Sequence, residues 1–340
     1  MTDAPLTDAA HPYRDFLAAD YWHQAGSTHG GPAYKEWYHF CVMQSDIEVL
    51  VNFSCLGTRS GVQTRPRLTV LVREPSGAWE GDVEEYGLRQ SNPEPGQFDA
   101  TFGRNRMWLD AEGYHLQCLL QRRDVELSLD LTPLVKPVVA NAVRLSERES
   151  IRWMAAPHLR ASGSVTVGGV RHQIRDAAAY HDRNWGPFSW GGSYAWEWAT
   201  IVPDDKDAGW CAVYSRISDS TRAMTRSQSL ILWKDQLPGR KFFGRDLHVE
   251  MRGRRHQDKV LQVPRMMALV LNPSAPDVPQ NMQIRATGFG AELDADLHFE
   301  SFAHIGVPND QGIGLTTLCE IGGRARITDH GSGCWGKAVL

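Results

Sequence analysis

The 340-residue sequence lacks a surplus of positive charge, an export signal and a long hydrophobic run. Its formal net charge is −4 and its charges are interspersed, so we expect no nucleic-acid binding. The longest apolar runs, such as Met266–Leu271, are far shorter than the ~20 residues that span a bilayer. We expect no integral membrane segment, whereas peripheral membrane contact stays open. The first twenty residues lack the basic and apolar regions of a secretory signal, which predicts a cytoplasmic protein.

Cysteine is sparse, and the usual cofactor motifs are missing. The six cysteines form no CxxC pair and the 13 histidines have no ligand spacing, so neither a disulfide framework nor a metal site is expected. There is no P-loop, GxSxG elbow or HExxH motif. The GxGxxG match at Gly331–Gly336 ends four residues before the last residue, where no helix can follow. We therefore predict that the protein works without metal, flavin or nucleotide.

Alternation of apolar and polar residues is the dominant local pattern. In the segment 125–131, Val and Leu alternate with Glu, Ser and Asp, which predicts a strand with one buried face. Similar stretches occur at 47–53, 68–72, 165–167 and 324–327, and turn formers separate them. The fold class predicted is all-β, with short helices expected only at 15–22 and 220–228.

The length suits two domains of roughly 150 residues each. A tryptophan-rich segment, Tyr180–Trp198, is interrupted by glycine and proline near the middle of the chain. We place the boundary there, with an N-terminal β-domain at 1–188 and a C-terminal β-domain at 189–340. Domain interfaces favour ligand pockets, so we expect a pocket between or within the two β-barrel or β-sandwich domains.

Two polar segments are candidates for chemistry. The first is Glu36-Trp37-Tyr38-His39-Phe40, where alternation puts Glu36 and Tyr38 on one strand face and Trp37 on the other. The second runs from Tyr180 to Gly186 as Tyr-His-Asp-Arg-Asn-Trp-Gly. Its consecutive polar side chains would be costly to bury unless they bond to one another. It is either a turn stapled by Asp182 with Arg183 or the backbone, or a functional site.

The strand predicted after this segment contains an acid between small residues. Tyr194, Trp196 and Trp198 share one face, and Glu197 lies on the other between Ala195 and Ala199. If the face of Glu197 points inward, apolar surroundings would raise the pKa of Glu197 and make it a proton donor. If the tryptophans point inward instead, Glu197 meets solvent. Alternation alone leaves both arrangements open.

Taken together, Glu36-Trp37-Tyr38, the Tyr180–Gly186 segment and Trp196-Glu197-Trp198 resemble the carotenoid 1,2-hydratase (hydroxyneurosporene synthase) family. That family is related to the AttH-like lipocalin proteins and to the fungal lipocalin-like Diels–Alderases. The resemblance covers the chain from about Trp22 onward. It implies two tandem lipocalin-like β-domains that hold a long apolar polyene or polyketide without a cofactor.

This sequence departs from the family pattern at two places. Arg183 stands where the hydratases often have histidine. The stretch Trp210-Cys211-Ala212 lacks the tyrosine and aspartate that the family's acid–base chemistry implies. The resemblance therefore supports the fold more strongly than the reaction.

We predict a cofactor-free enzyme of the lyase or isomerase type, which hydrates, cyclises or rearranges a lipophilic isoprenoid or polyene. Its expected catalytic residues are Asp182, Glu197 and His181. The expected substrate-binding residues are aromatic or hydrogen-bonding: Glu36, Trp37, Tyr38, Tyr180, Asn184, Trp185, Tyr194, Trp196 and Trp198. A Diels–Alderase-type pericyclase and a non-catalytic lipid- or pigment-binding lipocalin are the alternatives.

Overall fold

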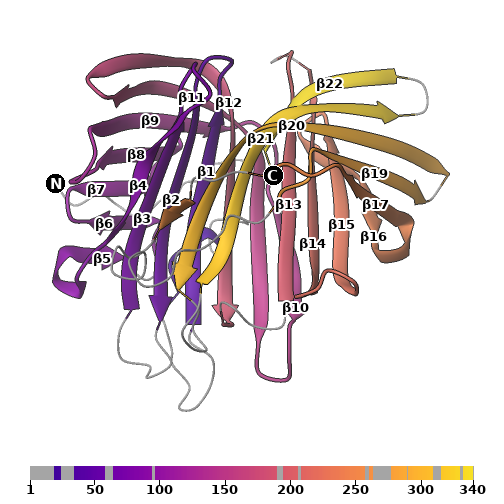
Figure 1. Cartoon of the computed structure of the whole chain (residues 1–340), viewed down its shortest axis with the longest axis horizontal. Helices are drawn as coiled ribbons and strands as arrows, with labels where there is room; N and C mark the ends of the chain where they lie inside the picture. Colours follow the sequence, from indigo (N-terminus) through magenta and orange to yellow (C-terminus); the bar gives the residue numbers. More distant parts are fainter. Residues whose placement is uncertain are drawn as a thin grey trace. The chain divides into compact units, whose positions relative to one another are not determined.

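The computed structural model describes residues 19–23, 34–57, 64–93, 96–189, 194–205, 208–256, 260–262, 277–288, 290–308, 315–329 and 332–339. Helical backbone in these residues is confined to Ala19, Asp20 and two 3-10 turns, η1 (Leu88–Gln90) and η2 (Gly244–Asp246). Nearly everything else is strand, which confirms the all-β prediction. None of the described helical segments has the length and hydrophobicity that crossing a bilayer requires. The chain divides into two compact units, Met1–Phe188 and Ser189–Leu340 (Figure 1).

The described part of the first unit forms one 12-stranded sheet in the order β4-β3-β2-β1-β12-β11-β9-β8-β7-β6-β5, with β10 paired to β11. Its strands are β1 (Tyr34–Met43), β2 (Glu48–Gly57), β3 (Thr64–Arg73), β4 (Trp79–Glu85), β5 (Ser91–Pro93), β6 (Asp99–Phe102), β7 (Asn105–Leu109), β8 (Tyr114–Leu119), β9 (Val125–Pro133), β10 (Val138–Arg144), β11 (Ser150–Val167) and β12 (Val170–Pro187).

This sheet curls around a single hydrophobic core. Leu68 of β3, Phe102 of β6 and Leu129 of β9 belong to the same buried cluster, so strands far apart in the sheet order face one another. On β9 the buried residues alternate strictly with exposed ones, as the sequence pattern predicts. The centre of the sheet is the antiparallel trio β1, β12 and β11.

The described part of the second unit forms a 10-stranded sheet in the order β16-β15-β14-β13-β22-β21-β20-β19-β17, with β18 parallel to β20. Its strands are β13 (Tyr194–Pro203), β14 (Trp210–Asp219), β15 (Thr225–Lys234), β16 (Leu237–Phe243), β17 (Leu247–Arg252), β18 (Val260–Gln262), β19 (Asn281–Gly288), β20 (Ala291–Pro308), β21 (Leu315–Asp329) and β22 (Ser332–Val339).

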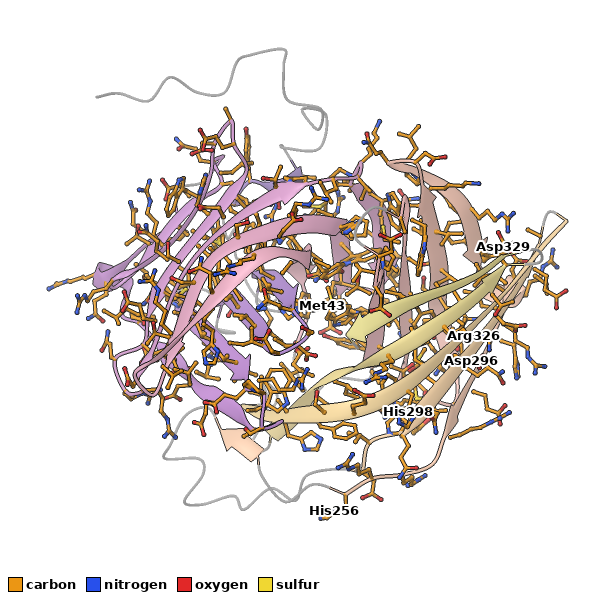
Figure 2. All side chains as sticks on the ribbon, turned by 90° about the horizontal axis from the view of Figure 1, so that it is seen from above. Met43, His256, Asp296, His298, Arg326 and Asp329 are labelled. Carbon is orange, nitrogen blue, oxygen red and sulfur yellow. The ribbon has the colours of Figure 1, made fainter. Side chains whose placement is uncertain are left out.

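The second sheet also has one buried face. Leu297 of β20 and Ala325 of β21 face each other across the strand pair inside the second core. The neighbouring pair Asp296 and Arg326 is exposed, and Figure 2 shows both side chains on the long β20–β21 ribbon. Period-two alternation therefore defines the core of this unit as well.

One of the two alternatives for Tyr180–Gly186 and one helix prediction are wrong. The segment Tyr180–Gly186 is not a turn but the last part of the 18-residue strand β12. The segment 220–228, expected to be a short helix, is instead the end of a β14–β15 connection and the start of β15 at Thr225. At 15–22, Ala19 and Asp20 are helical, and residues 15–18 lie outside the described residues.

Candidate functional site

Strand β12 divides its polar side chains between the two faces of the first sheet. One face, here the core face, continues the buried cluster of Ala177 and Ala179. His181, Arg183 and Trp185 follow on that face by alternation. The opposite face, here the polar face, consists of Tyr180, Asp182 and Asn184 with Trp37, His39 and Cys41 of β1 and Trp153 and Ala155 of β11.

On the core face, His181 pairs with an aspartate that lies far away in the sequence. Asp20 Oδ1 is 3.2 Å from His181 Nε2, and the Tyr114 hydroxyl donates to Asp20 Oδ2 at 2.6 Å. The other ring nitrogen of His181 lies 3.0 Å from the His39 carbonyl oxygen, which can only accept. The Asp20 carboxyl and the His181 imidazole therefore contact each other directly while both side chains are fully buried.

Arg183 is a second buried charge on the core face. Its guanidinium donates to Glu36 Oε2 at 2.7 Å and also to the Ala19 carbonyl oxygen and His23 Nδ1. The guanidinium carbon lies 4.9 Å from the Tyr38 ring centroid and 4.7 Å from that of Trp185. Arg183 thus contacts the faces of two aromatic rings and pairs with a carboxylate, which compensates for its burial.

These contacts fix residues 19–23 inside the first unit. The Tyr38 hydroxyl donates to the Asp20 carbonyl oxygen at 3.0 Å. The buried Trp22 packs against Tyr38 and Phe102, with ring centroids 4.5 Å and 6.4 Å apart. The core side of the β1–β12 pair is therefore occupied by the chain's own segment 19–23. We therefore assign the candidate site to the polar face.

Asp182 is the central acid of the polar face. Its Oδ2 accepts from the Tyr180 hydroxyl at 2.8 Å and from Trp153 Nε1 at 3.3 Å, and its Oδ1 accepts from Asn184 Nδ2 at 3.1 Å. Burial disfavours the charged form and raises the pKa of Asp182 to about 6, although the hydrogen bond from Tyr180 and the nearby His181 oppose this. The carboxyl can therefore exchange a proton close to neutral pH.

His39 lies across the strand pair from Asp182 on the same face. Burial lowers the pKa of His39 to about 3, and the nearby His181 adds to the effect, so its imidazole is neutral near pH 7. His39 Nε2 is 3.0 Å from Cys41 Sγ. The polar face thus places a neutral imidazole, hydrogen-bonded to a thiol, beside a carboxyl with a raised pKa.

The predicted acid Glu197 belongs to the second unit. It shares its face of β13 with Ala199, which is part of the second core, so this face points inward. Its surroundings are not apolar, because Arg216 Nη1 lies 3.0 Å from Oε2 and Arg222 Nε lies 3.1 Å from Oε1. Glu197 therefore has the inward orientation of the first arrangement expected from the sequence, but two arginines pair with it in place of apolar surroundings.

The predicted binding residues do not form one group. Among them, Trp37, Tyr180 and Asn184 lie on the polar face and Glu36, Tyr38 and Trp185 on the core face. Tyr194, Trp196 and Trp198 lie half-buried on the second unit's β13. The sequence interpretation missed Trp153, which donates to Asp182, and Cys41, which lies on the same face beside His39. The alternation that separates Trp37 and His39 from Glu36 could have found Cys41, two residues further along the same face.

Comparison with protein-family models gives no match, and neither does comparison with curated protein sequences. Solved structures do match. An AttH-type protein from Nitrosomonas europaea has a TM-score of 0.68 at 15% identity, over 99% of this chain and 98% of that one. Kievitone hydratase from Nectria haematococca has a TM-score of 0.61 at 12% identity, over 91% of this chain and 87% of that one.

A third similar structure is CghA with Sch210972, with a TM-score of 0.60 at 12% identity, over 96% of this chain and 95% of that one. At these identities the likeness concerns the fold, and it confirms the expected resemblance at that level. The chain therefore has the lipocalin-like fold of the AttH-type proteins over nearly its whole length.

Proposed function

We propose that the protein is a cofactor-independent enzyme that protonates an alkene of a lipophilic polyene or isoprenoid, with Asp182 as the acid. One observation carries this proposal: a buried carboxyl whose pKa is raised to about 6 lies on a face rich in tryptophan and tyrosine. A general acid works best when its pKa is near the working pH. The aromatic neighbours offer an apolar substrate the contact that its chain needs.

The proposed step transfers the Asp182 proton to one alkene carbon. The π electrons form the new C–H bond, and the adjacent carbon becomes a cation. The Asp182 carboxylate left behind accepts from Tyr180, Trp153 and Asn184, donors that are already in place. In a hydration, water adds to the cation and the resulting oxonium loses a proton. In a cyclisation, a second alkene attacks the cation, and the new cation then loses a proton or adds water; in a rearrangement, a neighbouring C–H proton leaves. In each case the Asp182 carboxylate takes up the released proton, which restores the acid.

His181 has a positioning role in this proposal. It lies on the core face, where Asp20 and the His39 carbonyl oxygen hold its ring, so it affects Asp182 through its charge and does not touch the substrate. Glu197 takes no part, because Arg216 and Arg222 already bind its carboxylate. The similar kievitone hydratase is, by its name, a hydratase. That likeness supports a lyase-type reaction here.

The test is turnover in heavy water. Linear polyenes and isoprenoid alcohols are incubated with the enzyme in D₂O, and the products are analysed by mass spectrometry. Proton transfer from Asp182, whose proton exchanges with solvent, places one deuterium on carbon in each product molecule. Asp182→Asn keeps the shape of the side chain but removes the transferable proton, so we expect ~10²–10⁴-fold less deuterated product.

The other outcomes identify the alternatives. A product that carries no deuterium would indicate a pericyclase, which needs only to hold the folded chain. Binding without conversion in the wild type and in Asp182→Asn would indicate a lipid- or pigment-binding protein. Either result would overturn acid catalysis. Thermal melts of both proteins accompany the kinetics, so that a loss of folded protein is not mistaken for a loss of chemistry.

A further inference from the structure

The amide of Asn184 has one buried atom that nothing in the described part of the chain satisfies. Its Nδ2 donates to Asp182 Oδ1, but its Oδ1 has no hydrogen-bond partner there. The side chain is only 1% exposed. An unsatisfied buried acceptor costs about 1–3 kcal/mol, so most such atoms in proteins have a partner. A hydrogen-bond donor is missing at this position.

The direction of the amide follows from its neighbour. Turning it around would bring Asn184 Oδ1 against Asp182 Oδ1 and place two acceptors together once Asp182 is ionised. The bond from Nδ2 to Asp182 therefore leaves the oxygen as the atom that needs a partner. The missing group must donate a hydrogen bond, which an ether or a hydrocarbon cannot do.

Two tryptophans flank this acceptor. Trp37 on β1 and Trp153 on β11 are the cross-strand neighbours of Asn184 on either side, so their side chains project from the same face. Both are buried. A single polar atom between two indoles suits a ligand that is apolar along its length and carries one donor group.

We propose that the polar face binds an apolar alcohol, whose hydroxyl group donates to Asn184 Oδ1 between Trp37 and Trp153. The inference rests on the proposed function only in taking the ligand to be a polyene or isoprenoid. It adds the substrate class: a hydroxylated chain is recognised, whereas the corresponding hydrocarbon leaves the acceptor unpaired. A site built around a hydroxyl discriminates against the analogue that lacks it.

The test uses three probes that differ at one group: all-trans-retinol, its methyl ether, and axerophthene, the hydrocarbon without the oxygen. Their affinities for the full chain are measured by quenching of tryptophan fluorescence. We expect retinol to bind at least ~10-fold more tightly than the other two, because only retinol can donate. Equal or weaker binding of retinol, or no binding of any probe, would overturn the proposal.

Two variants locate the effect. Asn184→Leu keeps the approximate shape and removes the acceptor, so we expect the three affinities to become equal within ~2-fold. Asn141→Leu makes the same change at an exposed position of β10 and should keep the preference for retinol. A preference that survives in Asn184→Leu would place the hydroxyl elsewhere and contradict the proposal. If Asn184→Leu fails to fold, the comparison of retinol with its ether in the wild type still decides.

This result is independent of catalysis. A preference for retinol without deuterium incorporation would support the hydroxyl site and overturn acid catalysis by Asp182. Deuterium incorporation without the preference would support the acid, and would mean that a trapped water fills the position at Asn184 Oδ1.

Discussion

His181 Nε2 and Asp20 Oδ1 lie 3.2 Å apart inside the first unit, although 161 residues separate them in the sequence. The pair ties the segment 19–23 to the central strand β12. Tyr114 completes the contact from β8 by donating to the second oxygen of Asp20. A single side chain thus connects three distant parts of the first unit.

Removing this connection should destabilise the protein strongly. Asp20→Ala leaves the buried His181 without its acidic partner, so we expect a loss of about 3–5 kcal/mol in the free energy of unfolding. Urea denaturation near neutral pH measures the loss. Asp99→Ala is the control, because it breaks the partly exposed pair with Arg106 and should cost less than ~1 kcal/mol. Similar losses for the two variants would show that the buried pair contributes little.

The pH dependence of turnover should follow Asp182. Because burial raises its pKa to about 6, the proton that it donates is present below that pH and absent above it. We therefore expect kcat to fall as pH rises through about 6. The residual activity of Asp182→Asn should lack this fall. If kcat of Asp182→Asn still falls as pH rises through about 6, another group is responsible for the pH dependence.

His115 provides a separate pH effect, on stability. Its Nε2 lies 2.9 Å from Asp110 Oδ1, and its Nδ1 lies 2.6 Å from Asp130 Oδ1. Partial burial opposes the charged form, but the hydrogen bonds that His115 donates to both carboxylates outweigh this effect and raise the pKa of His115. The folded state therefore holds the proton more tightly than the unfolded chain does.

Because its pKa is raised in the folded state, His115 stabilises the fold most at acid pH. The stabilisation is fully present below the unfolded pKa of ~6.5 and is lost as pH rises through the higher folded value. Melting temperatures of the wild type and His115→Gln, measured between about pH 5 and pH 9, should differ most at the acid end and converge at the alkaline end. A gap that widens with pH would contradict the assignment.

Gly186 should tolerate no side chain. Its φ is +149°, and a Cβ there would overlap the Ser150 carbonyl oxygen on β11, far inside van der Waals contact distance. We expect Gly186→Ala to lower the free energy of unfolding by at least ~2 kcal/mol. Gly87→Ala, at a position with negative φ and ordinary contacts, should change it by less than ~0.5 kcal/mol. Equal effects would mean that β11 can move away from β12.

The strands of this protein are largely predictable from alternation, because burying one sheet face imposes a period of two. The segment 125–131 lies within β9 and 68–72 lies within β3, as expected. The Tyr180–Gly186 segment misled the same reasoning because it is polar on both faces. Each face satisfies its own polar groups, Asp182 through Tyr180 and Trp153, and Arg183 through Glu36.

The sequence identified residues of the candidate site more readily than it identified the residues that contact them. Asp182 and Asn184 could be named from the sequence because both stand in one short polar segment. The contacts made by Trp153, and the pairing of Glu36 with Arg183, depend on strand register. The contact of Asp20 with His181 depends on residues 19–23 lying against β12. No local pattern in the sequence specifies contacts over such separations, since they follow from the strand order of the curled sheet.

Because side chains alternate along β12, its length is constrained in steps of two. One residue inserted between Ala177 and His181 would turn Asp182 toward the core face and bring a neighbouring residue out in its place. Two inserted residues would leave each side chain on its original face of the sheet but would change the residue that it faces on each neighbouring strand. Substitutions along this strand should accordingly fall into two interleaved series, with folding impaired at 181 and 183 and ligand handling impaired at 182 and 184.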